Sequence, residues 1–251
     1  MILAEPAVFA VALPAVVFAG ISKGGFGSGA AFASASILAL VIEPGRALGI
    51  MLPLLMLIDV STLRPYWRRW NRRDARRLLL GCVPGVALGA VLYTVAEPDL
   101  FRLLIGSICL AFIVWRMALR AGLVKLSGRP LPGWAGMLAG TVAGFTSFVS
   151  HAGGPPAAVY LLSQRLDKTT FQATTVLVFW VLNMMKFVPY AFLGIFTLDT
   201  ILLDLMLAPF AVLGAWLGVR AHRVVPERLF FAITYVLLAV TGTKLIWDAL
   251  T

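Results

Sequence analysis

The sequence predicts an all-α membrane protein that crosses the bilayer many times and is built from two related halves. Of its 251 residues, 61% are hydrophobic and only 13% are charged, whereas charged residues make up about a quarter of an ordinary soluble domain. Apolar stretches of roughly 17 to 25 residues, the length needed to cross a bilayer, recur from one end of the chain to the other. Composition and repeated apolar stretches therefore place the whole chain in the membrane.

Hydropathy and turn-forming residues predict ten helical segments. The N-terminal apolar run has no basic residues before it, so we expect a first membrane helix rather than a cleaved signal peptide. Pro-containing turns such as Glu43-Pro44-Gly45 and Glu97-Pro98-Asp99 mark the joints. The expected segments are 6–21, 26–42, 46–66, 75–96, 98–120, 132–148, 154–164, 169–194, 199–220 and 228–248.

Matching positions on the two sides of a central linker indicate an internal repeat. At an offset of 124 residues, Gly20 pairs with Gly144 and Asp59 with Asn183; the further pairs are Pro65 with Pro189, Tyr66 with Tyr190 and, after a shift of one, Pro84 with Pro209 and Gly89 with Gly214. We therefore expect a first membrane repeat over 1–121, a cytoplasmic linker over 122–133 and a second repeat over 134–251. Because each half has an odd number of segments, five, the second half is inverted relative to the first, as in many secondary transporters.

The basic residues predict the orientation. Most of the 21 Lys and Arg residues fall in the segment joints at 64–77, 116–129, 165–168 and 220–228, which the positive-inside rule assigns to the cytoplasm. Both termini are then expected on the periplasmic side of a bacterial inner membrane. Grouped at helix ends, the basic residues indicate lipid headgroup contact rather than a nucleic-acid site.

Two glycine-rich stretches, residues 22–29 and 147–156, break the hydrophobic segments. A break leaves backbone amides to be satisfied by protein, water or ligand, and the positive end of a half-helix suits an anion. Pro155 or Pro156 fits the first turn of the outgoing helix. The hairpins are expected to meet near the bilayer midplane, although small residues that only permit close helix packing would give the same pattern.

Ionisable and polar residues between the apolar stretches suggest a site. A charge such as Lys23 is costly in the membrane, so it needs either a bound anion or an internal partner, for which Asp59 is the candidate. His151 titrates near neutral pH and could carry a proton, bind substrate or serve as a structural histidine. Asn183 and Lys186 share one helical face, with snorkelling to the interface as the alternative for Lys186.

The expected site combines both breaks with the long segment of the second half. The substrate-binding candidates are Ser22, Lys23, Gly24, Gly25, Ser147, His151, Gly153, Gly154, Asn183 and Lys186, and Asp59 and His151 are candidates for binding a coupling ion or balancing charge. No metal or cofactor is expected, because Cys82 and Cys109 lie in apolar runs without ligand spacing. The coupling ion would be a proton or sodium, and the expected partners are a small anion, lipids and a second copy in a homodimer.

Two motifs resemble the paired signatures of the TauE/SafE sulfite exporter family. They are Ala19-Gly20-Ile21-Ser22-Lys23-Gly24-Gly25-Phe26-Gly27 and Gly144-Phe145-Thr146-Ser147-Phe148-Val149-Ser150-His151-Ala152-Gly153-Gly154-Pro155-Pro156, and the resemblance continues through Val159-Tyr160-Leu161-Leu162 and Asp167-Lys168. It implies transport of sulfite, organosulfonates or related small anions, in either direction. Phe148, Ser150 and His151 depart from the smaller residues frequent in the second motif.

The leading hypothesis is thus an ion-coupled secondary transporter that holds a sulfonate or sulfite between the two breaks. Alternatives are a transporter or channel for another small organic anion such as a carboxylate. A membrane enzyme is not expected, because the sequence has no Gly-x-Ser-x-Gly elbow and no metal-ligand cluster. No nucleotide-binding motif is present either, which argues against ATP hydrolysis by this chain.

Overall fold

The structure, a computed structural model, describes residues 6–26, 30–123, 130–224 and 227–251. Gly27, Ser28 and Gly29 of the first break and residues 124–129 of the expected linker lie outside the described residues. All regular secondary structure in the described part is helical. The fold is therefore all-α, as the sequence predicts.

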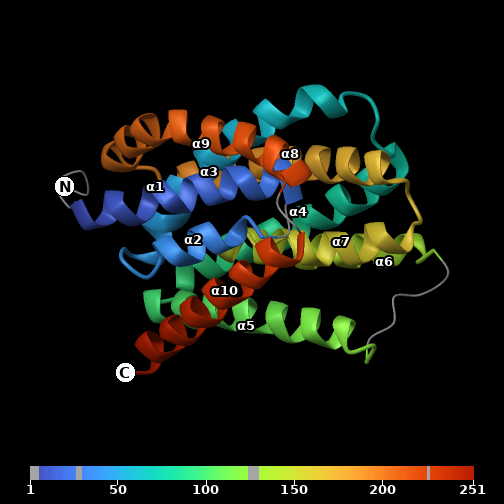
Figure 1. Ribbon diagram of the computed structural model, residues 1–251. Helices are drawn as coiled ribbons and strands as arrows, with labels where there is room; N and C mark the ends of the chain where they lie inside the picture. The colour runs from blue at the N-terminus through green and yellow to red at the C-terminus, as the bar shows by residue number, and fades with distance from the viewer. Residues whose placement is uncertain (1–5, 27–29, 124–129, 225–226) are drawn as a thin grey trace.

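In the part of the chain that the structure describes, ten α-helices follow the order of the ten predicted segments (Figure 1). In the first half they are α1 (Pro6–Ile21), α2 (Phe32–Leu38), α3 (Pro44–Leu63), α4 (Arg72–Val95) and α5 (Pro98–Arg120), with a π-helical turn η2 (Ser22–Phe26) after α1 and a 3₁₀ turn η3 (Arg64–Tyr66) after α3. In the second half they are α6 (Gly133–Ser150), α7 (Gly154–Ser163), α8 (Lys168–Phe192), α9 (Leu198–Val224) and α10 (Glu227–Leu250).

Local chemistry explains most of the helix ends. Pro44 and Pro98 start α3 and α5 in their first turns, where no intrahelical N–H is lost. The side chain of Asn71 caps α4 by accepting from the Asp74 amide, and Asp167 caps α8 by accepting from the amides of Thr169 and Thr170. Helix α3 ends three residues before the predicted boundary, because Pro65 cannot donate the next backbone hydrogen bond.

Among the described residues, seven helical stretches are long and apolar enough to cross a membrane, counting α1 together with its π-helical turn. In contrast, α2 has 7 residues and α7 has 10, which correspond to about 10 and 15 Å at 1.5 Å per residue, well short of a hydrocarbon core of about 30 Å. The short second helix of each half is therefore too short to cross the membrane. The chain is a multi-pass membrane protein.

Helix packing is compatible with the predicted inverted repeat. Helix α1 packs on α9, and their counterparts α6 and α4 pack on each other; α5 packs on α10 and α3 on α8, which are counterparts too. The arrangement is what a two-fold relation between the halves would produce. The repeat boundaries at residues 121 and 134 stay a prediction.

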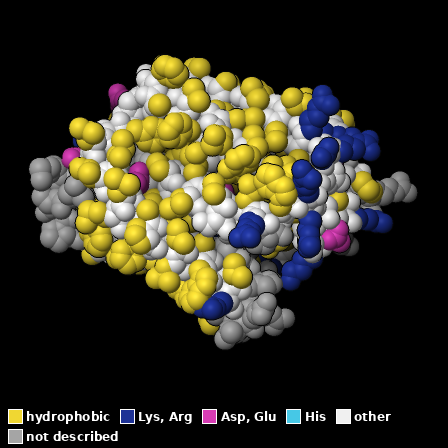
Figure 2. Space-filling model, turned by 90° about the horizontal axis from the view of Figure 1, so that it is seen from above, with side chains coloured by type: hydrophobic (Ala, Val, Ile, Leu, Met, Phe, Trp, Pro, Cys, Tyr) yellow, Lys and Arg dark blue, Asp and Glu magenta, His cyan; other side chains and the backbone are white. Residues whose placement is uncertain are grey.

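Most of the basic side chains lie toward one end of the molecule. Figure 2 shows Lys and Arg side chains gathered at one end, while the middle of this face is largely hydrophobic. Helix α1 begins and α10 ends at the opposite end (Figure 1). This separation fits the predicted topology, in which the basic end faces the cytoplasm and the termini do not.

Candidate functional site

The break between α6 and α7 is a tight turn centred on His151. Helix α6 ends at Ser150, and His151 adopts a left-handed conformation with φ of 56°, which is uncommon for a residue other than glycine. The His151 amide donates to the Ser147 carbonyl at 2.9 Å, and the Ala152 amide donates to the Thr146 carbonyl at 3.2 Å. This turn directs the imidazole into the protein, where His151 is only 7% exposed.

Pro155 and Pro156 stand in the first turn of α7, as predicted. They also limit what this helix can offer an anion, because neither has an N–H. The next amide, that of Ala157, already donates to the Gly153 carbonyl at 3.4 Å. The start of α7 consequently offers an anion fewer free backbone amides than a glycine-rich break alone would suggest. Side chains must therefore supply most of the hydrogen-bond donors.

Lys186 on α8 is the centre of the polar cluster at this break. Its Nζ lies 2.9 Å from Ser147 Oγ, 3.1 Å from the Ser147 carbonyl oxygen and 2.7 Å from His151 Nδ1. The residue is 0% exposed, so the amine faces the interior and does not snorkel. Its position at the C-terminal end of α6 also places the cation near the negative end of that helix.

The partners of His151 define its protonation. His151 Nε2 lies 3.2 Å from the carbonyl oxygen of Leu48 on α3, which can only accept a hydrogen bond. Nε2 therefore carries the hydrogen, and Nδ1 accepts from Lys186. In this arrangement the imidazole is neutral, and it connects the second half of the chain to a backbone carbonyl of the first.

A second polar cluster lies one turn away on the same face of α8. Lys23 Nζ forms a buried salt bridge with Asp59 Oδ1, and Asn183 Nδ2 donates to Asp59 Oδ2 at 2.7 Å. The ion pair between Lys23 and Asp59 is thus present, which was one of the two alternatives for Lys23. Asn183 and Lys186 lie on one buried face, as their spacing predicts.

Asp59 and Asn183 are also a pair of positions that the predicted repeat would make equivalent. Their side chains touch although 124 residues separate them in the chain. Two equivalent residues can contact each other only near the axis that would relate the halves. The polar site therefore lies where the two halves meet, between α3 and α8.

The glycines of the site pack against helix backbones. A Cβ atom on Gly24 would overlap the carbonyl oxygen of Ala215, and one on Gly25 would overlap that of Gly218, both on α9. A Cβ atom on Gly153 would lie 2.7 Å from the carbonyl oxygen of Ala143. Close packing, the alternative explanation for these residues, is what the structure shows, and direct contact of these glycines with substrate stays a prediction.

Counting charges separates the two clusters. Lys23 and Asp59 neutralise each other. Among the described residues, the hydrogen bonds of Lys186 go to neutral groups, and no acid lies within salt-bridge distance of it. A buried cation in a membrane protein calls for a compensating charge. Lys186, rather than Lys23, is the side chain that a bound anion would compensate.

Sequence reasoning missed a third buried polar cluster, which connects α4 and α7 toward the basic end. Tyr160 donates to Asp74 Oδ1 at 2.8 Å, and Arg77 Nη1 lies 3.2 Å from the same oxygen and 3.1 Å from the Tyr160 hydroxyl. The one signal in the sequence that could have revealed this cluster is Asp74, the single acid within the arginine-rich stretch 64–77. These hydrogen bonds link the short helix α7 to the long helix α4.

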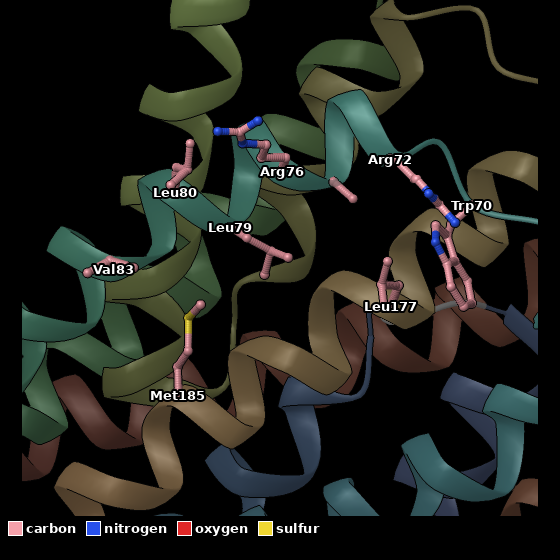
Figure 3. A pocket seen from close by; sticks show the side chains of 9 residues that line it. Trp70, Arg72, Arg76, Leu79, Leu80, Val83, Leu177 and Met185 are labelled. Atoms are coloured by element: carbon pink, nitrogen blue, oxygen red, sulfur yellow. The ribbon is translucent and has the colours of Figure 1, made fainter. Parts of the chain in front are cut away.

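The polar site is closed off in this conformation. A groove of about 460 Å³ runs between α4 and α8, with Arg72, Arg76 and Trp70 toward one end and apolar side chains such as Leu79 and Met185 along it (Figure 3). A second groove, of about 280 Å³, is lined by residues of α5 and of the α6–α7 break. Neither lining includes Lys186, His151 or Asp59. An anion from either side could reach Lys186 only after the helices move.

Comparison with known proteins identifies the family of the chain. The family model for the sulfite exporter TauE/SafE family matches residues 12–245, almost the entire chain. The chain therefore belongs to the TauE/SafE family of membrane transporters. No curated protein matches it, and no solved structure does.

Proposed function

We propose that this TauE/SafE family member is a secondary transporter that binds a small sulfur oxyanion, an organosulfonate or sulfite, at Lys186. The observation that carries the proposal is the fully buried Lys186, whose Nζ, among the described residues, has hydrogen bonds only to Ser147 and His151. Family membership supports a sulfur anion as the cargo. The net charge of the site, one positive charge, favours a singly charged anion.

The donors around Lys186 suit a sulfonate. Its three oxygens can accept from the ammonium of Lys186, the hydroxyl of Ser147 and the amide of Asn183, and charge-assisted hydrogen bonds of this kind are stronger than neutral ones. Lys186 would exchange its bonds to Ser147 for bonds to the anion. The Lys23–Asp59 pair, one turn away, holds Asn183 in place through the Asp59 carboxylate.

Alternating access follows from where the site lies. Lys186 of α8 contacts Ser147 of α6 and His151 of the break in the second half, and His151 in turn contacts Leu48 of α3 in the first half. A movement of one half against the other would open the cluster to one side of the membrane and then to the other. The closed polar site corresponds to an intermediate between those two states.

The proposal is tested by transport and binding with Lys186→Met. The purified protein in proteoliposomes should take up labelled methanesulfonate or sulfite, and Lys186→Met should weaken binding by about 30-fold or more, because losing a buried charge-paired donor costs about 2 kcal/mol or more. Lys244→Met, which removes an exposed lysine paired with Asp248 on α10, is the matched control. It should transport like the unmodified protein.

A ligand screen separates the sulfur anions from other cargo. A ligand that binds the folded state raises the thermal unfolding temperature, so methanesulfonate and sulfite should stabilise the protein more than acetate or sulfate. Stabilisation by acetate alone would assign the site to carboxylates. Normal uptake by Lys186→Met would refute the site, and a passive ionic current in planar bilayers would indicate a channel.

A further inference from the structure

One buried acid in the membrane part remains without a partner. Asp204 on α9 is 7% exposed, and neither of its carboxyl oxygens has a hydrogen-bond partner among the described residues. Asp59 and Asp74, the other buried acids, are held by Lys23 and Arg77. Asp204 is therefore unlike both of them.

The neighbouring helices supply no free charge to compensate Asp204. Helix α9 packs against α1, α3 and η2. No residue of α1 is ionisable, and the ionisable side chains on the other two are Lys23, Arg46 and Asp59. Lys23 and Asp59 pair with each other, and Arg46 lies 3.7 Å from Glu43 at the exposed start of α3. An unpaired carboxylate inside a membrane is costly, so burial in these surroundings favours a bound proton on Asp204.

The place of Asp204 in α9 connects it to both a water-facing end and the first break. It lies six residues after the start of α9 at Leu198, roughly 9 Å along the helix, and so nearer the end opposite the basic residues. Two turns further on, Ala211 and Ala215 contact Gly20 and Gly24 at the first break. A movement that exposes Asp204 to water would therefore also move the helix that supports Lys23.

We infer that Asp204 is the site of a coupling proton and that one proton travels with each singly charged anion. This inference rests on the proposed function. Water on the side opposite the basic end supplies the proton, which converts the Asp204 carboxylate into a carboxylic acid. The same proton is released when the helices rearrange and Asp204 meets water on the other side.

The charge count gives the stoichiometry. With Lys23 and Asp59 cancelling and His151 neutral, the variable buried charges are Lys186, Asp204 and the anion. Their sum is zero when the anion and the proton are both bound, and zero again when both are absent. Either one bound alone leaves a net buried charge, which the membrane disfavours. The two neutral forms are the ones that cross between states, so transport is symport without net charge movement.

Proteoliposomes with a proton gradient test the inference. For one-to-one symport, a gradient of about one pH unit, acidic outside, should accumulate radiolabelled methanesulfonate about tenfold inside. A potassium-valinomycin potential should leave that ratio unchanged. Asp204→Asn should abolish accumulation but still exchange labelled for unlabelled methanesulfonate, whereas Asp204→Glu should retain it. The matched control is Asp248→Asn, an exposed acid paired with Lys244.

Chemical labelling provides a second readout that needs no transport. Dicyclohexylcarbodiimide modifies protonated carboxyl groups in apolar surroundings, so mass spectrometry should find an adduct on Asp204 and none on the ion-paired Asp59. Accumulation by Asp204→Asn equal to that of the unmodified protein, or the absence of an Asp204 adduct, overturns the inference. A protein that carries the Asp204 adduct but takes up no sulfur anion would instead refute the proposed function.

Discussion

Three buried side chains, Lys23, Asp59 and Lys186, share the polar interior but have different tasks. Lys23 and Asp59 form an ion pair that also fixes Asn183, whereas Lys186 contacts only neutral groups. The ion pair is structural in this conformation, and the free charge belongs to Lys186. The two lysines should therefore respond differently to substitution.

Lys23→Met is expected to destabilise the protein, because it leaves Asp59 buried without a partner. Breaking a buried ion pair by removing one partner costs about 3 to 5 kcal/mol, while removing both partners costs much less. The double variant Lys23→Met/Asp59→Leu should therefore recover most of the lost stability. Denaturant unfolding in detergent measures both effects, and a double variant no more stable than Lys23→Met would contradict the structural role of the pair.

The sequence could indicate these residues but could not pair them. Lys23 and Asp59 stood out because charges are rare in apolar segments, and the repeat aligned Asp59 with Asn183. Their contact depends on how α3 and α8 cross, which no local pattern encodes. Asp204 is just as unusual in an apolar segment, but the positions that the repeat would align with it are leucines, and nothing in the sequence showed that it would lack a partner.

At the scale of helices, the glycines of the first break determine how closely α9 approaches. Gly24 and Gly25 sit directly against the backbone of α9 at Ala215 and Gly218. Helix positions were predictable, since ten segments were expected and ten helices are present. The role of the glycines was not predictable, because a glycine that binds an anion and a glycine that packs on a helix look the same in a sequence.

Gly24→Ala is expected to lower stability even without any ligand. The added methyl group would overlap a backbone oxygen, which cannot move like the end of a side chain, and overpacking of this kind costs about 1 to 3 kcal/mol. Thermal unfolding of the ligand-free protein measures the effect. Unchanged stability together with lost anion binding would instead assign Gly24 to the substrate site.

For the molecule as a whole, the polar site lies between two halves, and most of the basic side chains on the face shown in Figure 2 gather toward one end. That asymmetry predicts a topology with the basic end in the cytoplasm and both termini in the periplasm. Alkaline phosphatase fused after Thr251 should then be active. A green fluorescent protein fused at the same position and exported by the same route should not fluoresce. The reverse pattern would place the termini in the cytoplasm and invert the direction assigned to the Asp204 proton.

The central claim, that the anion binds at Lys186, is tested most directly by locating the anion itself. An experimental structure with a bromine-labelled sulfonate would show the head group by its anomalous signal. The account predicts sulfonate oxygens at hydrogen-bond distance, about 3 Å, from Lys186 Nζ and Ser147 Oγ, with the Lys23–Asp59 pair intact. A sulfonate bound to Lys23 with that pair broken, while Lys186 keeps its bonds to Ser147 and His151, would contradict it.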